Sequence, residues 1–162
     1  MKVAVLSDTH LPRGARRLAE ECVRRLGEVE LVLHAGDFTA RAVLDELERM
    51  APVLGVHGNM DEAELREGLP ARRIVEVGKA HVGMVHDAGP AAGRHERLVA
   101  AFPGCEAVVY GHTHVPEVAE HAGVLILNPG SPTERRRAPT RSIGLLTVAG
   151  DRLIPELVPI GP

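Results

Sequence analysis

The sequence predicts a layered α/β domain in which two facing β-sheets are flanked by helices. In the first half of the chain, short apolar runs alternate with helical patterns, which is typical of parallel strands joined by right-handed crossovers. Runs such as Val3-Ala4-Val5-Leu6 are apolar on both faces, as expected for strands that are covered on both sides. The second half carries several short strands separated by turn signals, which indicates a second sheet.

The first half is predicted to form a βαβαβ unit. Its apolar periodicity predicts strands at residues 2–6, 30–33 and 52–56 and helices at residues 15–26 and 40–50. Such a unit places its strands parallel to one another, so their carboxyl ends meet at one edge of the sheet.

The second half is predicted to begin with a hairpin. Residues 72–77 and 81–85 are expected to pair around Gly78, and a helix is expected near residues 95–102. After the apolar run at residues 107–110, strands are expected at residues 124–127, 142–148 and 153–158, with Gly150-Asp151 as the turn between the last two. Because no linker or internal repeat separates these parts, we expect a single domain over residues 1–162.

The length and charge of the chain indicate a single domain that does not bind nucleic acid tightly and nonspecifically. With 162 residues, one domain can bury about two thirds of the surface of the unfolded chain. The formal net charge of −3 provides no basic field for tight nonspecific binding to nucleic acid. Aromatic residues that could stack on bases are scarce, so a nucleic acid is not the expected partner.

The start of the chain and its cysteines indicate a cytoplasmic protein. Met1 leads directly into a strand without a charged and apolar leader, and no apolar run approaches the length needed to span a bilayer. Cys22 and Cys105 lack the spacing of a redox or metal motif, so we expect two free thiols. No membrane is expected among the partners.

Side chains that bind metals follow five of the apolar runs. One of them, Asp8-Thr9-His10, is a common string when it occurs alone, and the most informative motif is Gly111-His112-Thr113-His114. Because residues i and i+2 of an extended segment project to the same side, both rings of the second motif can reach one centre. The full set of candidate metal ligands is Asp8, His10, Asp37, Asn59, His86, His112 and His114.

Each of these residues also has an ordinary structural explanation. Asp37 could cap the helix expected from residue 40, Asn59 could form an Asx turn, and His86 alone could be a hydrogen-bonded core residue. As a set, they favour a site for two divalent ions that share one carboxylate. The two ions bring four positive charges, and two aspartates and a bridging hydroxide remove three of them. The net charge of the site is then roughly +1, which suits a phosphate ester.

The order of the motifs resembles that of the calcineurin-like metallophosphoesterase superfamily. The resemblance covers nearly the whole chain, and the chain length is similar to that of the small YfcE-like bacterial and archaeal phosphodiesterase branch. It rests on Asp8-Thr9-His10, Gly36-Asp37, Gly58-Asn59-Met60-Asp61, the strand-terminal His86, Gly111-His112-Thr113-His114 and Asn128-Pro129-Gly130-Ser131.

The resemblance implies that the fold is a four-layer αββα sandwich of two mixed sheets. It also implies that the protein is a dinuclear phosphodiesterase. Such an enzyme would hydrolyse a small phosphodiester through a metal-bridging hydroxide, with Mn as the first choice of metal and Ni, Fe, Zn or Co as others. One ion would be held by Asp8, His10, Asp37 and His114, and the other by Asp37, Asn59, His86 and His112. Asp37, Asn59 and His86 are also the expected catalytic residues, and the branch implies a homo-oligomer.

Two departures from the superfamily pattern affect the expected chemistry. Many members carry a histidine directly after the asparagine, where it is thought to protonate the leaving group, but this chain has Met60. Substrates with good leaving groups are therefore the safer expectation. Asp87 follows His86 where relatives commonly have glycine, which would alter the loop without removing the ligand.

Two other functions are alternatives to the phosphodiesterase. A retromer subunit shares this fold and works through protein contacts, so a protein-binding scaffold is one alternative, and a nuclease is the other. The presence of every expected ligand favours catalysis over the scaffold.

Other polar residues have less defined roles. The cluster Arg135-Arg136-Arg137 with Arg141 is expected to be a solvated loop unless it folds over the metals, where an arginine could bind a substrate phosphate. Ser131 could present donors to the substrate or close a turn, and Asp61 is expected to brace the metal-binding loops or cap a helix. The remaining histidines are expected to be structural or surface groups. His34 and His57 lie close to candidate ligands in the sequence, whereas His81, His95 and His121 do not.

Overall fold

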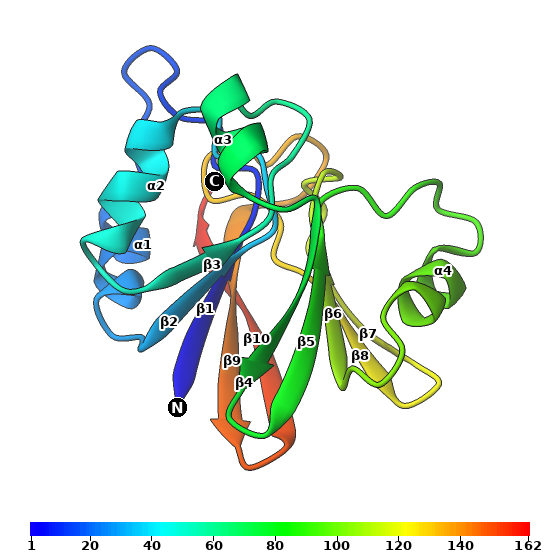
Figure 1. The fold of residues 1–162 in the computed structure, drawn as a ribbon. Coiled ribbons are helices and arrows are strands. Elements are labelled where there is room, and N and C mark those ends of the chain that lie inside the picture. Colours follow the sequence, from blue (N-terminus) through cyan, green and yellow to red (C-terminus); the bar gives the residue numbers. More distant parts are fainter.

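Two five-stranded sheets face each other in the computed structural model, which describes residues 1–162 (Figure 1). The first sheet has the strand order β10-β9-β1-β2-β3, and the second has the order β4-β5-β6-β8-β7. Helices α1 and α2 cover the outer side of the first sheet, and α4 lies outside the second (Figure 1). The predicted four-layer αββα architecture with two mixed sheets is confirmed.

The first sheet contains the βαβαβ unit that the apolar runs predict. Strand β1 pairs in parallel with β2, and β2 pairs in parallel with β3. The antiparallel hairpin of β9 and β10 adds to the other side of β1. The elements of this half of the fold are β1 (Lys2–Leu6), α1 (Glu20–Leu26), β2 (Leu31–His34), α2 (Arg41–Glu48), β3 (Val53–Gly55), α3 (Ala63–Gly68), β9 (Arg141–Ala149) and β10 (Arg152–Gly161).

The second sheet begins with the predicted hairpin around Gly78. Strand β5 then pairs in parallel with β6, and β6 pairs in parallel with β8. Strand β7 closes the sheet as an antiparallel edge strand. The elements are β4 (Arg72–Val77), β5 (Ala80–Val85), α4 (Arg94–Ala101), β6 (Ala107–Tyr110), β7 (Glu117–His121) and β8 (Val124–Asn128).

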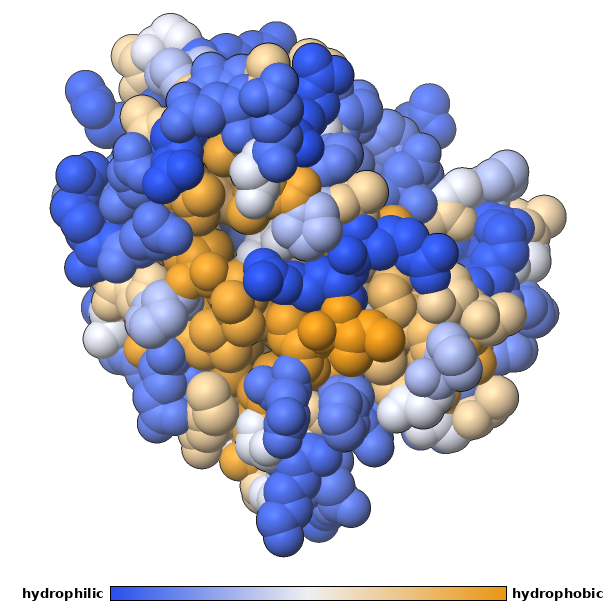
Figure 2. All heavy atoms as spheres, in the orientation of Figure 1, coloured by the Kyte–Doolittle hydropathy of each residue, from blue (hydrophilic) through white to orange (hydrophobic).

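Three apolar clusters hold the layers together. The cluster between the sheets includes Val5, Leu33 and Val109, so the two sheets share one core. A second cluster packs the first sheet against its helices, and a third packs the second sheet against α4. On the face seen in Figure 2, apolar residues gather along the middle, and polar residues cover the region of the helices.

Three elements differ from the sequence prediction. The first helix begins at Glu20 and not at residue 15, because the preceding loop is held elsewhere, with the Arg16 guanidinium 2.6 Å from the Glu134 carboxylate. Helix α3 was not predicted, since six residues are too few to establish a helical period. Strand β7 was also missed, because this edge strand alternates between half-buried and exposed residues and contains charged groups.

The helices of the fold are short, and its two cysteines are buried. None of the helices combines the length and the apolar character needed to cross a membrane. Cys22 and Cys105 are both buried and free, as expected. Burial raises the pKa of the Cys22 thiol to about 12, so this side chain acts as an apolar core residue.

Candidate metal centre

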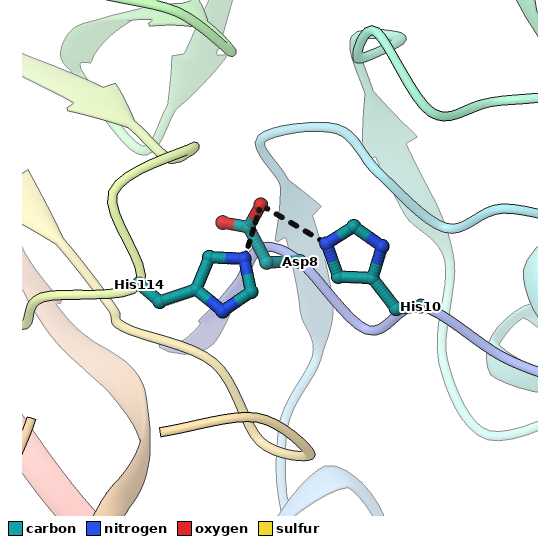
Figure 3. Close-up of side chains that lie close together, drawn as sticks. All are labelled: Asp8, His10 and His114. Carbon is teal, nitrogen blue, oxygen red and sulfur yellow. Dashed lines mark ion pairs between the residues drawn. The ribbon is translucent and has the colours of Figure 1, made fainter. Parts of the chain in front are cut away.

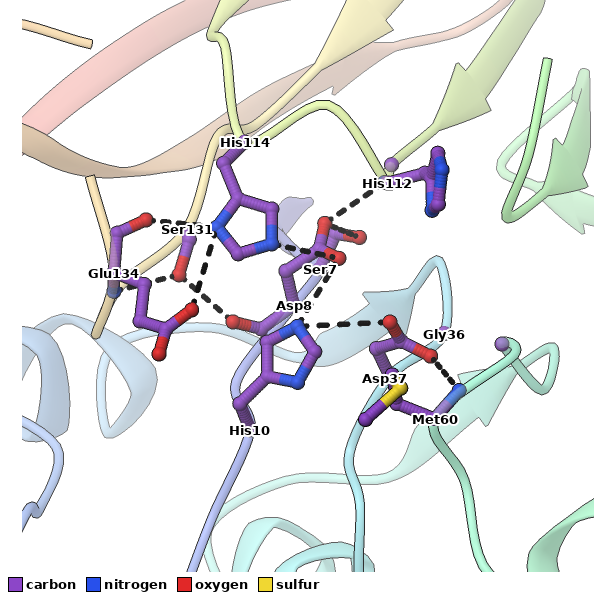
Figure 4. A network of polar contacts seen from close by, with 12 residues as sticks. Ser7, Asp8, His10, Gly36, Asp37, Met60, His112, His114, Ser131 and Glu134 are labelled. Carbon is purple, nitrogen blue, oxygen red and sulfur yellow. Dashed lines mark hydrogen bonds and ion pairs between the residues drawn. The ribbon is translucent and has the colours of Figure 1, made fainter. Parts of the chain in front are cut away.

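The loops that follow five strands meet at one end of the two sheets. Asp8 follows β1, Asp37 follows β2, Asn59 follows β3, His86 follows β5, and His112 follows β6. This placement agrees with the expectation that functional groups gather beyond the carboxyl ends of strands in α/β folds. Figure 4 shows how several of these side chains point toward one another.

The first cluster consists of Asp8, His10 and His114, whose ligand atoms all lie within 4.8 Å of one another (Figure 3). The Asp8 Oδ1 atom lies 3.3 Å from His114 Nε2 and 3.5 Å from His10 Nε2. All of these side chains are buried, so bulk water screens their interaction little.

The second cluster consists of Asp37, His86 and His112, again with ligand atoms within 4.8 Å of one another. The His86 Nε2 atom lies 3.2 Å from Asp37 Oδ2 and 3.1 Å from Asn59 Oδ1. Because His86 Nδ1 donates a proton to the Ala35 carbonyl at 2.7 Å, Nε2 is the nitrogen that faces these oxygens. The structure thus brings Asn59 to the edge of this cluster.

Asp37 belongs to the second cluster and also faces the first. Its Oδ2 atom is 3.5 Å from His10 Nε2 in the first cluster and 3.2 Å from His86 Nε2 in the second. The two clusters are therefore adjacent, and one carboxylate faces both.

The first cluster contains buried atoms that the protein itself leaves without hydrogen bonds. Asp8 Oδ1, His10 Nε2 and His114 Nε2 have no partner, although buried polar atoms in folded proteins almost always have one. These three atoms converge on one point, and carboxylate oxygens and imidazole nitrogens are ligands that divalent transition metals accept. The donor set therefore fits a metal ion.

The ionisation of the site depends on pairs between carboxylates and imidazoles. Burial alone would raise the pKa of Asp8, but the imidazoles of His10 and His114 outweigh burial and hold the pKa well below its usual range. Burial likewise opposes ionisation of Asp37 and His86, yet their mutual contact lowers the pKa of Asp37 and raises the pKa of His86. The contact with Asp37 favours the protonated form of His86, and a bound cation would take the place of that proton.

Backbone carbonyls orient two of the imidazole rings. His86 Nδ1 donates to the Ala35 carbonyl at 2.7 Å, and His114 Nδ1 donates to the Glu134 carbonyl at 2.9 Å. Each bond fixes the tautomer in which Nε2 is available to a metal. Glu134 was not among the sequence candidates, since the bond uses its backbone and leaves no signal in the side-chain pattern.

His34 and Asp61 support the loops without contacting the centre directly. His34 Nδ1 accepts the Gly36 N–H at 3.1 Å, so its Nε2 donates to the Thr9 hydroxyl at 3.1 Å. Burial lowers the pKa of His34 to about 3, which keeps this ring neutral. The Asp61 carboxylate accepts the N–H groups of Asp37, Thr39 and Gly58, which confirms the expectation that it braces the metal-binding loops.

Ser131 supports the first cluster and does not face a substrate. Its hydroxyl is fully buried and donates to the Asp8 carbonyl at 2.7 Å (Figure 4). The neighbouring Thr133 hydroxyl donates to the Thr9 carbonyl at 2.8 Å. Ser7, which the sequence did not single out, donates its hydroxyl proton to Asp8 Oδ2 at 2.6 Å.

Glycine is required at two motif positions by close contacts. A Cβ atom at Gly58 would lie 2.1 Å from Asp37 Oδ1, and one at Gly111 would lie 1.8 Å from the Ser7 hydroxyl oxygen. Both distances are far below van der Waals contact. The glycines of the Gly-Asn and Gly-His motifs therefore let the ligand loops approach one another.

The expectation that both rings of the Gly-His-Thr-His motif reach one centre was wrong. His112 lies in the cluster with Asp37, whereas His114 lies in the cluster with Asp8. In an extended segment both rings would project to the same side, but His112 and His114 have φ values of 70° and 60°. Asp8, His10 and Asp37 also adopt positive φ, which non-glycine residues rarely do outside functional sites.

The other histidines do not belong to either cluster. His95 is 2.8 Å from a Glu117 carboxylate oxygen, and His81 is near Glu106. His57 lines a depression next to the second cluster, together with Asn59 and His86. His121 packs near His95.

The family model that matches this sequence describes a calcineurin-like phosphoesterase superfamily domain and spans residues 1–151. The chain belongs to this superfamily. Its members include a "probable metallophosphoesterase" of Methanothermobacter thermautotrophicus, which is 37% identical and aligns over 99% of this chain and 94% of the relative. A phosphodiesterase of Methanocaldococcus jannaschii is 31% identical over 80% of this chain and 83% of its own length.

Solved structures agree with the fold of this superfamily member. A single mutant of Vps29 from Entamoeba histolytica matches with a TM-score of 0.79 and 26% identity, covering 98% of this chain and 99% of that one. The predicted metallophosphoesterase family, including its small archaeal and bacterial members, is thus confirmed.

Proposed function

We propose that the protein is a dinuclear metal-dependent phosphodiesterase that hydrolyses a small phosphodiester. The observation that carries this proposal is the pair of adjacent ligand clusters, with the Asp37 carboxylate facing both. The phosphodiesterase of M. jannaschii supports a diester as the substrate class.

The first cluster together with the Asp37 carboxylate supplies four ligands, and the second cluster, which contains Asp37, supplies four together with Asn59. We assign the first ion to Asp8, His10, Asp37 and His114, and the second ion to Asp37, Asn59, His86 and His112. Two divalent ions bound there would supply an activated water and positive charge against the phosphate. Manganese is our first choice, because oxygen ligands suit it and imidazole is tolerated, whereas Ni, Fe, Zn and Co fit the same donors.

The residues of the chain prepare this centre for an anionic substrate. The carbonyls of Ala35 and Glu134 keep the Nε2 atoms of His86 and His114 directed inward. The Asp61 carboxylate fixes the backbone of Asp37 and of Gly58, which precedes Asn59. Such prior organisation lowers the cost of positioning the ligands during the reaction.

The position after Asn59 limits the range of leaving groups. Met60 is 57% exposed at the rim of the second cluster, and its thioether cannot donate a proton to a departing alkoxide. The proposed enzyme therefore favours diesters whose leaving groups are stable as anions, such as nitrophenolate.

Hydrolysis of bis(4-nitrophenyl) phosphate tests the proposal. The protein is stripped with a chelator and assayed with and without added manganese. We expect hydrolysis only with metal, and a loss of at least a hundredfold in kcat for Asp37→Asn, which weakens the carboxylate shared by both clusters. Asp45→Asn, an exposed residue of α2, serves as the control.

Two results would contradict the proposal. Absence of hydrolysis with every divalent metal tried would favour the protein-binding scaffold. Degradation of single-stranded or duplex DNA at a higher kcat/KM than that of small diesters would favour the nuclease.

A further inference from the structure

A cleft of about 710 Å³ opens beside the loop that carries His112 and His114. Thr113, the residue between these two histidines, forms part of its wall. The cleft therefore lies beside the loop that contributes one histidine to each ligand cluster, and none of the candidate ligands lines it. Its polar lining consists of Arg94, Tyr110, Thr113, Glu117, Arg136 and Arg137.

The charged groups of the cleft are predominantly positive. Three arginines and one glutamate give a formal charge of +3 − 1 = +2. The carboxylate of Glu117 is already engaged, because one oxygen lies 2.8 Å from His95 Nε2 and the other accepts the Tyr110 hydroxyl proton. The guanidinium groups thus dominate the field in the cleft.

Two of these arginines have almost no partner within the protein. Arg137 makes no hydrogen bond or ion pair, and the single ion pair of Arg136 is a long one of 4.0 Å to Glu134. The neighbouring Arg135 is different, since it lies outside the cleft and donates to the Ala138 carbonyl at 3.1 Å. Arg94 lies over the Tyr110 ring, 5.6 Å from its centroid, and donates to the Gly89 carbonyl.

The loop that carries these arginines is attached to the metal centre. The Ser131 hydroxyl donates to the Asp8 carbonyl at 2.7 Å, and the Glu134 carbonyl accepts the His114 Nδ1 proton at 2.9 Å. Arg136 and Arg137 lie two and three residues after Glu134. These two hydrogen bonds therefore hold the start of the loop that carries the arginines against the first cluster.

We propose that this cleft binds a second phosphoryl group, carried on one ester arm of the phosphodiester substrate. This inference rests on the proposed function for the position of the reacting phosphate. Guanidinium groups bind phosphate through paired, charge-assisted hydrogen bonds, and Arg136 and Arg137 have donors free to make them. The preferred substrate is then a diester with two anionic groups, such as a nucleotide diester that bears another phosphate.

Two diesters that differ by one phosphate test this inference. Both are 4-nitrophenyl esters of thymidine 5′-phosphate, one with a free 3′-hydroxyl and one with a 3′-phosphate, so the leaving group is identical. We expect the manganese-loaded protein to hydrolyse the 3′-phosphate form with a kcat/KM at least about tenfold higher, as expected for charge-assisted contacts. In the double variant Arg136→Gln/Arg137→Gln, this ratio falls toward one.

The control is Arg135→Gln, which removes a neighbouring positive charge outside the cleft and should keep the wild-type ratio. Since Arg136 and Arg137 are exposed, the double variant is expected to fold, and its melting temperature checks this. Equal kcat/KM values for the two diesters in the wild-type protein, or an unchanged ratio in the double variant, would overturn the inference.

Calorimetric titration separates the cleft from catalysis. Wild-type protein should bind thymidine 3′,5′-bisphosphate at least about tenfold more tightly than thymidine 5′-phosphate, and the double variant should lose this difference. If neither diester is hydrolysed, the proposed function fails, and the titration decides the inference alone. Equal binding of the two nucleotides would then overturn it.

Discussion

The Asp61 carboxylate offers a quantitative test of how the metal-binding loops are held. It is only 3% exposed and accepts three backbone N–H groups, from Asp37 at 3.1 Å, Thr39 at 2.7 Å and Gly58 at 2.7 Å. In Asp61→Asn, the amide oxygen can retain the two donors that share Oδ2. The amide NH2 then faces the Thr39 N–H, which leaves that donor without an acceptor.

We expect this substitution to lower the free energy of unfolding by about 2 kcal/mol, the typical cost of one unsatisfied buried donor. For a protein of this size, that corresponds to a decrease of about 4 to 8 °C in Tm. Asp61→Ala removes all three acceptors and should cost more.

The assay is thermal unfolding of the metal-free protein, because bound metal would add its own stabilisation. Asp45→Asn is the control, since Asp45 makes only an exposed ion pair with Arg41, and such pairs contribute little. If the Tm of Asp61→Asn matched that of the Asp45→Asn control, the bracing role of Asp61 would be refuted.

The stabilisation of the protein by metal should depend on pH. His86, with its raised pKa, stabilises the metal-free protein below about pH 6.5 and loses this effect as the pH rises through its folded pKa. His34, with its pKa lowered to about 3, opposes this trend, because it disfavours the folded state as the pH falls below about 6.5. The increase in Tm caused by manganese should grow from pH 6 to pH 8, because metal requires neutral imidazoles; a metal-induced increase that shrinks from pH 6 to pH 8 would contradict this. Gly58→Ala should lower metal-dependent hydrolysis at least a hundredfold, since the new Cβ would lie 2.1 Å from Asp37 Oδ1 and must displace that carboxylate. The control is Gly68→Ala, which should leave the rate unchanged because no atom lies within 4 Å of the new Cβ. Equal rates for the two alanine variants would show that the close contact at Gly58 has no consequence.

The order of strands and ligands could be predicted from the sequence because both are local patterns. Apolar runs define β1, β2 and β3, and each ligand follows a run directly. The errors arise where tertiary contacts override a local pattern. The start of α1 is displaced by the contact between Arg16 and Glu134, which are far apart in sequence.

The supporting contacts of the candidate site could not be predicted in the same way. The Glu134 carbonyl orients His114, but a backbone group gives no signal in the sequence. The arginine cluster was recognised as a set, yet only Arg136 and Arg137 line the cleft, whereas Arg135 bonds to a carbonyl of its own loop. Which arginine faces a substrate depends on loop geometry, and the composition of the loop does not determine it.

The number of metal ions bound per chain tests the central claim most directly. Chelator-treated protein is dialysed against manganese, and bound metal is measured by mass spectrometry at several free concentrations. The account predicts saturation at two ions per chain, with a clear loss for Asp37→Asn, whose carboxylate faces both clusters. Saturation at one ion or none, or two ions bound undiminished by Asp37→Asn, would contradict the shared centre.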